Sequence, residues 1–271
     1  MRPDVRRETV TLLCLPYAGG SASLYREWTA RLPDWIKLMP LHMPGRGVRL
    51  AMRPMHRWPE LIDLLVADAL PHVSGPYAIF GHSLGSLVGI ELAYALDARH
   101  GRPPVWVGAS AGKAPSHRPR MLHWLDCPED EFLDEVRALK GMPEALLQDR
   151  EFMKLVLPYL RADFHLSGSY LYPDAGRMTP LHCPLLVVNG TEDYEMHADP
   201  LTLSEWSRET LGTCDRRVID AGHFFINTHR DALIDMVVDS LARAVHLSRP
   251  YATPLHACTV DSQRPSRRFV S

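Results

Sequence analysis

Short apolar runs bounded by proline and glycine alternate with longer segments of helical spacing along most of this chain. The runs read VTLLCLP (10–16), IKLMPLHMP (36–44), YAIFG (77–81), VWVGAS (105–110), PLLVVNG (184–190) and RRVIDAG (216–222). Strands that alternate with helices build βαβ units, in which a crossover helix joins two parallel strands. The sequence therefore predicts an α/β fold with a mostly parallel central sheet flanked by helices.

Residues 112–180 interrupt this alternation, because they hold helical patterns and no clear strand. One pattern ends at Gly141, and in the next Pro158 is expected to kink or end the helix. We predict a single domain over residues 1–247 with a helical lid inserted at about 112–180, termed the insertion below. Residues 248–271 are rich in Pro, Ser and Arg without periodicity, so we expect a disordered or loosely attached tail.

Charge and cysteine usage exclude several classes of function. The net charge of −2 gives no global field that would attract nucleic acid or a membrane surface. The five cysteines are scattered without a C-x-x-C pair, which argues against a disulfide framework or zinc site and for a cytosolic protein. No apolar stretch approaches the roughly 18 residues that span a bilayer. We therefore expect a cytoplasmic protein that binds neither nucleic acid nor membrane.

The most specific motif is the G-x-S-x-G formed by residues 81–85, within IFGHSLGS. A strand-like run precedes it and an amphipathic helical pattern ending at Gly101 follows it, which is the context of a nucleophile elbow. Glycine is expected at 81 and 85 because side chains there would collide with neighbouring backbone. Ser83 would lie at a helix N-terminus, whose partial positive charge favours a developing anion. The motif predicts that Ser83 is a nucleophile.

A serine hydroxyl is a weak nucleophile at neutral pH and needs an adjacent base, normally histidine. In hydrolases built on an α/β sheet, the chain order is serine, then acid, then histidine. His223, in VIDAGHFFIN, follows the last strand-like run on a glycine-hinged loop. His229 falls at the start of a helical pattern, a less suitable position. His223 is therefore the predicted base.

Three carboxylates follow the apolar run before residue 190, in VVNGTEDYEMH: Glu192, Asp193 and Glu195. Alternate residues leaving a strand point in opposite directions, so Glu192 and Asp193 cannot both face a histidine. The shorter side chain of Asp193 also loses less rotamer freedom when it is held. Asp193 is the favoured acid, with Glu195 in reserve and Asp220 as a weaker candidate.

An oxyanion hole needs backbone N–H groups aimed at the developing charge. Leu84, directly after the serine, would supply one. The loop after the first strand, LPYAGGSASLY, has small residues that let backbone approach a substrate, and Ala18 is the candidate for the second donor. The loop HMPGRGVR (42–49) carries two arginines, for which solvated charges and a phosphate contact are equally open.

Taken together, these pieces resemble the type II thioesterases that serve polyketide and nonribosomal peptide synthases. The matching segments lie in order between about residues 10 and 240: LLCLPYAGGSASLYREW, MPGRGVRL, IFGHSLGSLVGIELA, LPYLRADFHLSGSY, CPLLVVNGTED and DAGHFFIN. The resemblance implies an α/β-hydrolase fold with a helical lid, and hydrolysis of acyl groups from the phosphopantetheine arm of a carrier protein. The family often has histidine in place of Tyr17, and proline in place of Tyr194.

The resemblance also implies the site: Ser83 as nucleophile, His223 as base, Asp193 as acid, and Ala18 and Leu84 as oxyanion donors. No metal or organic cofactor is required, and a monomer is expected. Because a serine–histidine–acid site also cleaves oxygen esters, three alternatives stay open. They are a carboxylesterase or lipase, an acyltransferase that passes the acyl group to an alcohol or amine, and a non-catalytic binding protein.

Overall fold

The computed structural model describes residues 8–173, 179–193 and 201–247. Within them the chain forms a six-stranded sheet in the order β2-β1-β3-β4-β5-β6, and every neighbouring pair is parallel. The strands are β1 (Val10–Leu15), β2 (Ile36–Pro40), β3 (Tyr77–His82), β4 (Trp106–Ser110), β5 (Leu185–Gly190) and β6 (Cys214–Ile219). Each overlaps one of the six runs, so the predicted α/β fold with a parallel sheet is confirmed.

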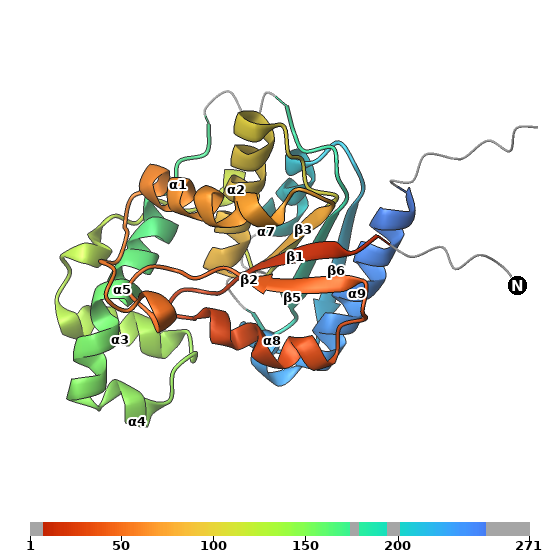
Figure 1. The fold of residues 1–271 in the computed structure, drawn as a ribbon. Coiled ribbons are helices and arrows are strands. Elements are labelled where there is room, and N and C mark those ends of the chain that lie inside the picture. The colour runs from red at the N-terminus through yellow and green to blue at the C-terminus, as the bar shows by residue number, and fades with distance from the viewer. Residues whose placement is uncertain (1–7, 174–178, 194–200, 248–271) are drawn as a thin grey trace, which may run out of the picture.

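Helices cover both faces of this sheet and one of its ends (Figure 1). The α-helices are α1 (Trp58–Ala69), α2 (Leu84–His100), α3 (Glu129–Ala138), α4 (Glu144–Leu147), α5 (Arg150–Ser169), α7 (Leu201–Ser204), α8 (Phe225–Thr228) and α9 (Arg230–Leu247). The 3-10 helices are η1 (Ala22–Ala30), η2 (Gly47–Arg49), η3 (Leu70–His72), η4 (Pro115–His117), η5 (His123–Leu125) and η6 (Glu205–Glu209).

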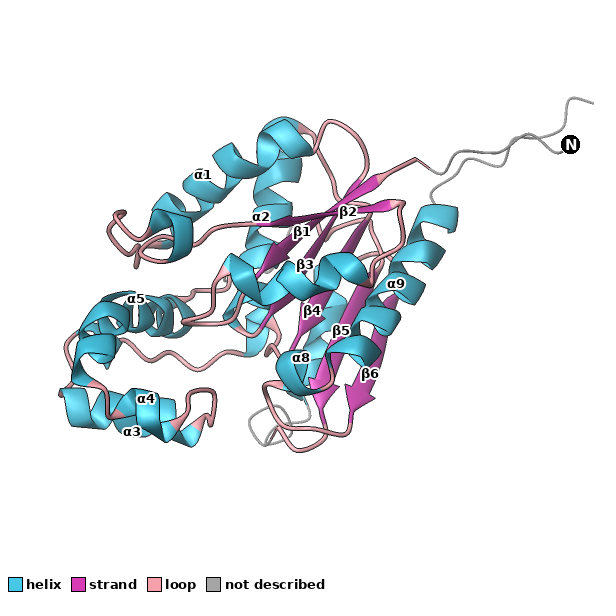
Figure 2. Ribbon diagram, turned by 60° about the horizontal axis from the view of Figure 1, so that its bottom comes forward, coloured by secondary structure: helices cyan, strands magenta, loops and turns pink. Residues whose placement is uncertain are grey.

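The two faces of the sheet bury two separate sets of apolar side chains, because successive residues of a strand point to opposite sides. In β1, Leu13 and Leu15 pack on the side of α1 and α2. Leu12 and Cys14 pack on the other side, with η1, α8 and α9. Figure 2 shows the resulting three layers, with the sheet between the two helical layers. Burial on both faces explains why the four central strands, β1, β3, β4 and β5, read as continuous apolar runs.

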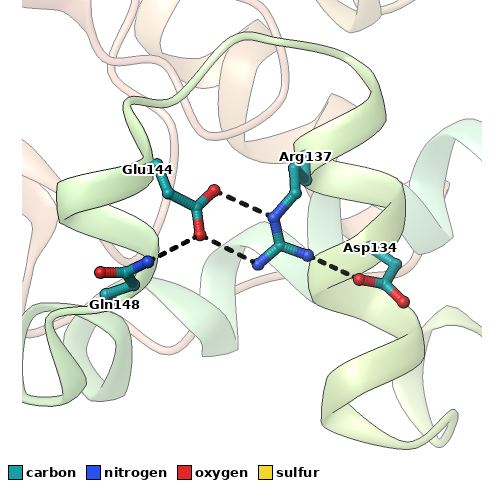
Figure 3. A network of polar contacts seen from close by, with 4 residues as sticks. All are labelled: Asp134, Arg137, Glu144 and Gln148. Carbon is teal, nitrogen blue, oxygen red and sulfur yellow. Dashed lines mark hydrogen bonds and ion pairs between the residues drawn. The ribbon is translucent and has the colours of Figure 1, made fainter.

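The insertion forms a group of helices beside one end of the sheet, where α3, α4 and α5 lie together (Figures 1 and 2). It has a buried cluster of its own, made by Trp124, Phe132, Val136, Leu147, Met153, Val156 and Leu160. At its surface, Arg137 on α3 bonds Glu144 on α4 at 2.9 Å and Asp134 at 2.6 Å (Figure 3). The insertion thus has a core of its own, and the C-terminal part of α5 also joins the sheet core on the α1 and α2 side through Leu166 and the following Tyr170.

Helix α5 continues through Pro158, so the expectation that the helix could end there is wrong. Proline removes the N–H that would bond the carbonyl of Lys154. Both residues lie on the exposed side of α5, where water can replace the lost hydrogen bond. In α3 the helix ends at Ala138, and Lys140 rather than Gly141 adopts a positive φ of 56°.

The expected tail, residues 248–271, lies outside the described residues. None of the helices within the described ranges is long and apolar enough to cross a lipid bilayer.

Candidate active site

Ser83 occupies a sharp turn between β3 and α2, with φ 55° and ψ −117°. This region of φ is unfavourable for any residue with a side chain and persists only where surrounding structure enforces it. A Cβ atom at Gly81 would collide with the backbone of Gly85, and one at Gly85 with the carbonyl of Leu15. Side chains at both positions would thus collide with neighbouring backbone, as the sequence predicted.

The structure brings Ser83, His223 and Asp193 together, although they lie on three separate loops. His223 Nδ1 is 2.6 Å from Asp193 Oδ2, and His223 Nε2 is 3.0 Å from Ser83 Oγ. A carboxylate only accepts hydrogen bonds, so Nδ1 carries the proton and Nε2 is free to accept from the serine hydroxyl. The side chains of His223 and Asp193 are only 14% and 4% exposed, so water competes little for these bonds.

The competing acids in the described residues point elsewhere. The side chain of Glu192 is exposed. Asp220 is also exposed and accepts a hydrogen bond of 2.7 Å from the Thr191 hydroxyl. Glu195 and Tyr194 lie outside the described residues. Of the described candidates, Asp193 is the one that contacts His223.

His82, the residue before the serine, was not among the predicted site residues. It is fully buried; its Nε2 lies 3.0 Å from the backbone carbonyl of His223 and its Nδ1 2.9 Å from Ser110 Oγ. The carbonyl can only accept, so Nε2 carries the proton and Nδ1 accepts from the Ser110 hydroxyl. Burial lowers the pKa of His82 well below its ordinary value, with His223 adding to the effect. A neutral His82 therefore ties the backbone of His223 to the sheet.

Ala18 and Leu84 line one pocket together with Ser83 and His223. Leu84 is the first residue of α2, so its amide lies in the turn where helical N–H groups have no partner within the helix. The Gly19 amide donates to Asp163 and the Gly20 amide to Tyr17, whereas in the described structure the Ala18 amide donates to no protein group. Both predicted oxyanion donors thus lie beside Ser83 with uncommitted backbone N–H groups.

The remaining wall of this pocket comes largely from the insertion. Apolar side chains of Met121, Trp124, Leu139 and Phe164 face it, and Lys113, Arg118 and Glu135 add charge. Among the described residues, no three histidine, cysteine or carboxylate side chains cluster in a way that could hold a metal ion. The pocket next to the serine is therefore lined by a mixture of apolar, polar and charged side chains.

Tyr17, which stands where histidine is frequent in the resembling family, packs within the site. Its ring makes edge-on contacts with the rings of Phe224 at 5.1 Å and His82 at 6.0 Å between centroids. The substitution therefore keeps an aromatic support for the loop that holds Ala18.

Both arginines of the 42–49 loop pair with carboxylates, so the solvated alternative is wrong for Arg46. Arg46 is 4% exposed and lies 2.7 Å from Asp163 of α5. Arg49 lies 2.6 Å from Asp68 of α1. The sequence could not show these partners, because Arg46 and Asp163 are 117 residues apart.

Comparison with known proteins identifies the family to which this chain belongs. The family model described as a thioesterase domain matches residues 10–241. The thioesterase PikA5 of Streptomyces venezuelae is 37% identical over 235 residues, which cover 86% of this chain and 81% of that protein. The gramicidin S biosynthesis protein GrsT of Aneurinibacillus migulanus is 31% identical over 230 residues, covering 85% and 88%.

Among solved structures, the type II thioesterase BorB from the borrelidin biosynthetic cluster superposes with a TM-score of 0.76 at 30% identity. The match covers 86% of this chain and 93% of that one. The predicted α/β-hydrolase fold and the resemblance to type II thioesterases are thereby confirmed. With a family match over nearly all of its described length, the chain belongs to the thioesterase family and is an enzyme that hydrolyses thioesters.

Proposed function

We propose that this thioesterase hydrolyses acyl groups from the phosphopantetheine arm of a carrier protein, and so clears stalled or aberrant acyl units from a polyketide or nonribosomal peptide synthase. The names of its relatives support this substrate, since GrsT is a gramicidin S biosynthesis protein and BorB comes from the borrelidin biosynthetic cluster. The observation that carries the mechanism is the hydrogen-bond chain from Asp193 through His223 to Ser83.

In the proposed first half-reaction, Ser83 Oγ attacks the thioester carbonyl carbon while His223 Nε2 takes the hydroxyl proton. Asp193 holds the imidazole in the Nδ1–H tautomer and stabilises the imidazolium that forms. The amides of Ala18 and Leu84 donate to the negative oxygen of the tetrahedral intermediate. The C–S bond then breaks, the sulfur leaves with the proton from His223, and the acyl group remains on Ser83.

In the second half-reaction, a water molecule gives its proton to His223 Nε2 and attacks the acyl-serine carbonyl. The same two amides hold the second oxyanion. When the C–O bond to Ser83 breaks, His223 returns the proton to the serine oxygen and the free acid leaves. Apart from the substrate and this water, the steps use side-chain and backbone groups of this chain.

We further propose that the insertion acts as the lid of a single domain. Supporting this, it has its own buried cluster and supplies Met121, Trp124 and Phe164 to the pocket beside Ser83. An apolar lid would hold the acyl chain and limit the access of bulk water.

The proposal also includes that the protein is a cytoplasmic monomer. Light scattering on the purified protein tests the oligomeric state, and the mass of a dimer would refute the monomer.

A comparison of matched substrates tests the substrate class. The same acyl group is offered on a carrier protein, on free pantetheine, and as an oxygen ester of equal chain length. We expect kcat/KM to be highest for the acyl-carrier protein and lowest for the oxygen ester. Faster cleavage of the oxygen ester would favour a carboxylesterase, and acyl transfer to an added alcohol or amine in preference to water would favour an acyltransferase.

A further inference from the structure

A buried ion pair joins the insertion to the loop that carries Ala18. Asp163 on α5 is 2% exposed and Arg46 is 4% exposed. The guanidinium contacts both carboxylate oxygens, with Nη2 2.7 Å from Oδ2 and Nη1 3.2 Å from Oδ1. Burial raises the pKa of Asp163, and the charge of Arg46 opposes that rise. The two side chains therefore form one charge-paired unit inside the protein.

Each member of the pair also holds one peptide group of the Gly-Gly loop, residues 16–20. The Gly19 amide donates to Asp163 Oδ2 at 2.8 Å, and Arg46 Nε donates to the Gly20 carbonyl at 2.5 Å. Gly19 has a φ of +80°, which residues with a side chain rarely adopt, and a Cβ there would also displace the end of the Leu160 side chain. Two consecutive glycines leave backbone free to rotate unless other groups fix it. The ion pair supplies that restraint directly after Ala18.

A role in stability alone explains this arrangement poorly. Removing two charges from water costs about as much as their attraction returns, and apolar replacements of buried pairs are frequently neutral or stabilising. A pair in which Asp163 Oδ2 and Arg46 Nε each also bond the same two-residue turn fits a geometric role better. The Gly19 amide is thereby committed to Asp163, whereas the Ala18 amide donates to no protein group among the described residues and Ala18 lines the pocket with Ser83.

We propose that Arg46 and Asp163 are positioning residues for thioester hydrolysis, which hold the Gly-Gly loop so that the Ala18 amide points at the oxyanion. The inference rests on the proposed function, in which Ala18 supplies one oxyanion donor. Because Asp163 belongs to α5 and α5 belongs to the insertion, the donor is aligned only while the insertion is docked on the loop. Lid position and oxyanion stabilisation are thereby coupled.

The test replaces the pair by apolar side chains of similar size, Arg46→Met/Asp163→Leu, in the full chain. A second variant, Arg46→Met/Asp163→Asn, also removes both charges but keeps an oxygen that can accept from Gly19. The matched control is Arg49→Met/Asp68→Leu. It removes the ion pair that joins the other arginine of the 42–49 loop to α1. Melting temperatures establish that each variant is folded.

Two readouts separate positioning from a general loss of structure. One is kcat and KM for a short acyl-pantetheine thioester. The other compares inhibition by an alkyl trifluoromethyl ketone, which adds to Ser83 and forms an oxyanion, with inhibition by the secondary alcohol of the same chain, which cannot add. A merely structural role would weaken binding of both inhibitors alike.

For Arg46→Met/Asp163→Leu we expect kcat to fall about 100-fold with KM unchanged, because misplacing one oxyanion donor costs roughly that factor. Inhibition by the ketone should weaken by a similar factor, while that by the alcohol stays constant. The Asn-containing variant should recover part of kcat, and the control should match wild type.

Wild-type kcat and ketone affinity in either folded variant of the Arg46–Asp163 pair would overturn the inference. If the Leu-containing variant does not fold, the Asn-containing variant decides by the same comparison with the control. The ketone readout depends on Ser83 and its oxyanion donors, and not on a carrier protein. Failure of the wild type to use acyl-carrier protein would therefore refute the proposed substrate and leave this inference standing.

Discussion

His82 Nε2 donates a hydrogen bond of 3.0 Å to the backbone carbonyl of His223, so two histidines 141 residues apart are joined next to Ser83. Only the second of them faces the serine hydroxyl. The first is fully buried, and burial lowers its pKa well below its ordinary value. The elbow therefore depends on a histidine that stays neutral.

This neutrality predicts how stability depends on pH. In the unfolded chain His82 takes up a proton below about pH 6.5, whereas in the folded protein it does not. The unfolded state then binds more protons, so the contribution of His82 to stability is present above pH 6.5 and is lost as the pH falls below it. The slope from this one group is about 1.4 kcal/mol per pH unit in that window.

The His82→Gln variant isolates this effect, because a glutamine amide can still donate toward the His223 carbonyl but does not titrate. Free energies of unfolding measured by urea denaturation between pH 7.5 and 5 should fall less steeply for the variant than for wild type. Parallel curves of unfolding free energy against pH for the two proteins would contradict the prediction. They would show that His82 titrates alike in the folded and the unfolded state.

The assignment of the acid predicts unequal effects for two neighbouring carboxylates. Asp193→Asn removes the charge that orients His223 and stabilises its protonated form, and kcat should fall by about 10³- to 10⁴-fold. Glu192→Gln changes an exposed side chain and should leave kcat unchanged. Steady-state hydrolysis of one acyl-pantetheine measures both. Equal losses in the two variants would mean that Asp193 has no special role.

Close packing of the elbow predicts a strong effect from one methyl group. Gly85→Ala places a Cβ against the carbonyl of Leu15, and the resulting backbone shift should destabilise the fold by about 3 kcal/mol or more. Gly75→Ala is the matched control, since that position is open and its φ is unexceptional. Thermal melting compares the two. A Gly85→Ala variant as stable as Gly75→Ala would contradict the packing described for the elbow.

The sheet and the elbow could be predicted because their signals are local. The four central strands are buried on both faces, so their apolar runs stand out from the flanking segments. The glycines at 81 and 85 have a steric reason that follows from the turn itself. His82 could also have been placed, since it continues the alternation of Ala78 and Phe80 toward the same buried side.

The ion pair of Arg46 and Asp163 could not be predicted, because a buried charge shows itself only through its partner. Nothing near Arg46 in the chain marks it as buried, and the partner belongs to a helix 117 residues away. Whether the helix would end at Pro158 or continue through it was left open by the sequence for a related reason. Whether proline ends a helix depends on whether water can reach the freed carbonyl, which only the packing decides.

Replacement of the serine hydroxyl tests the central claim most directly. With an acyl-carrier protein as substrate, Ser83→Ala should lower kcat by several orders of magnitude, on the order of 10⁴- to 10⁶-fold, because the covalent step is then impossible. Its melting temperature should stay at least as high as that of wild type, since the change to alanine removes no contact that the fold needs. Hydrolysis of the acyl-carrier protein by folded Ser83→Ala at a rate near that of wild type would contradict the account.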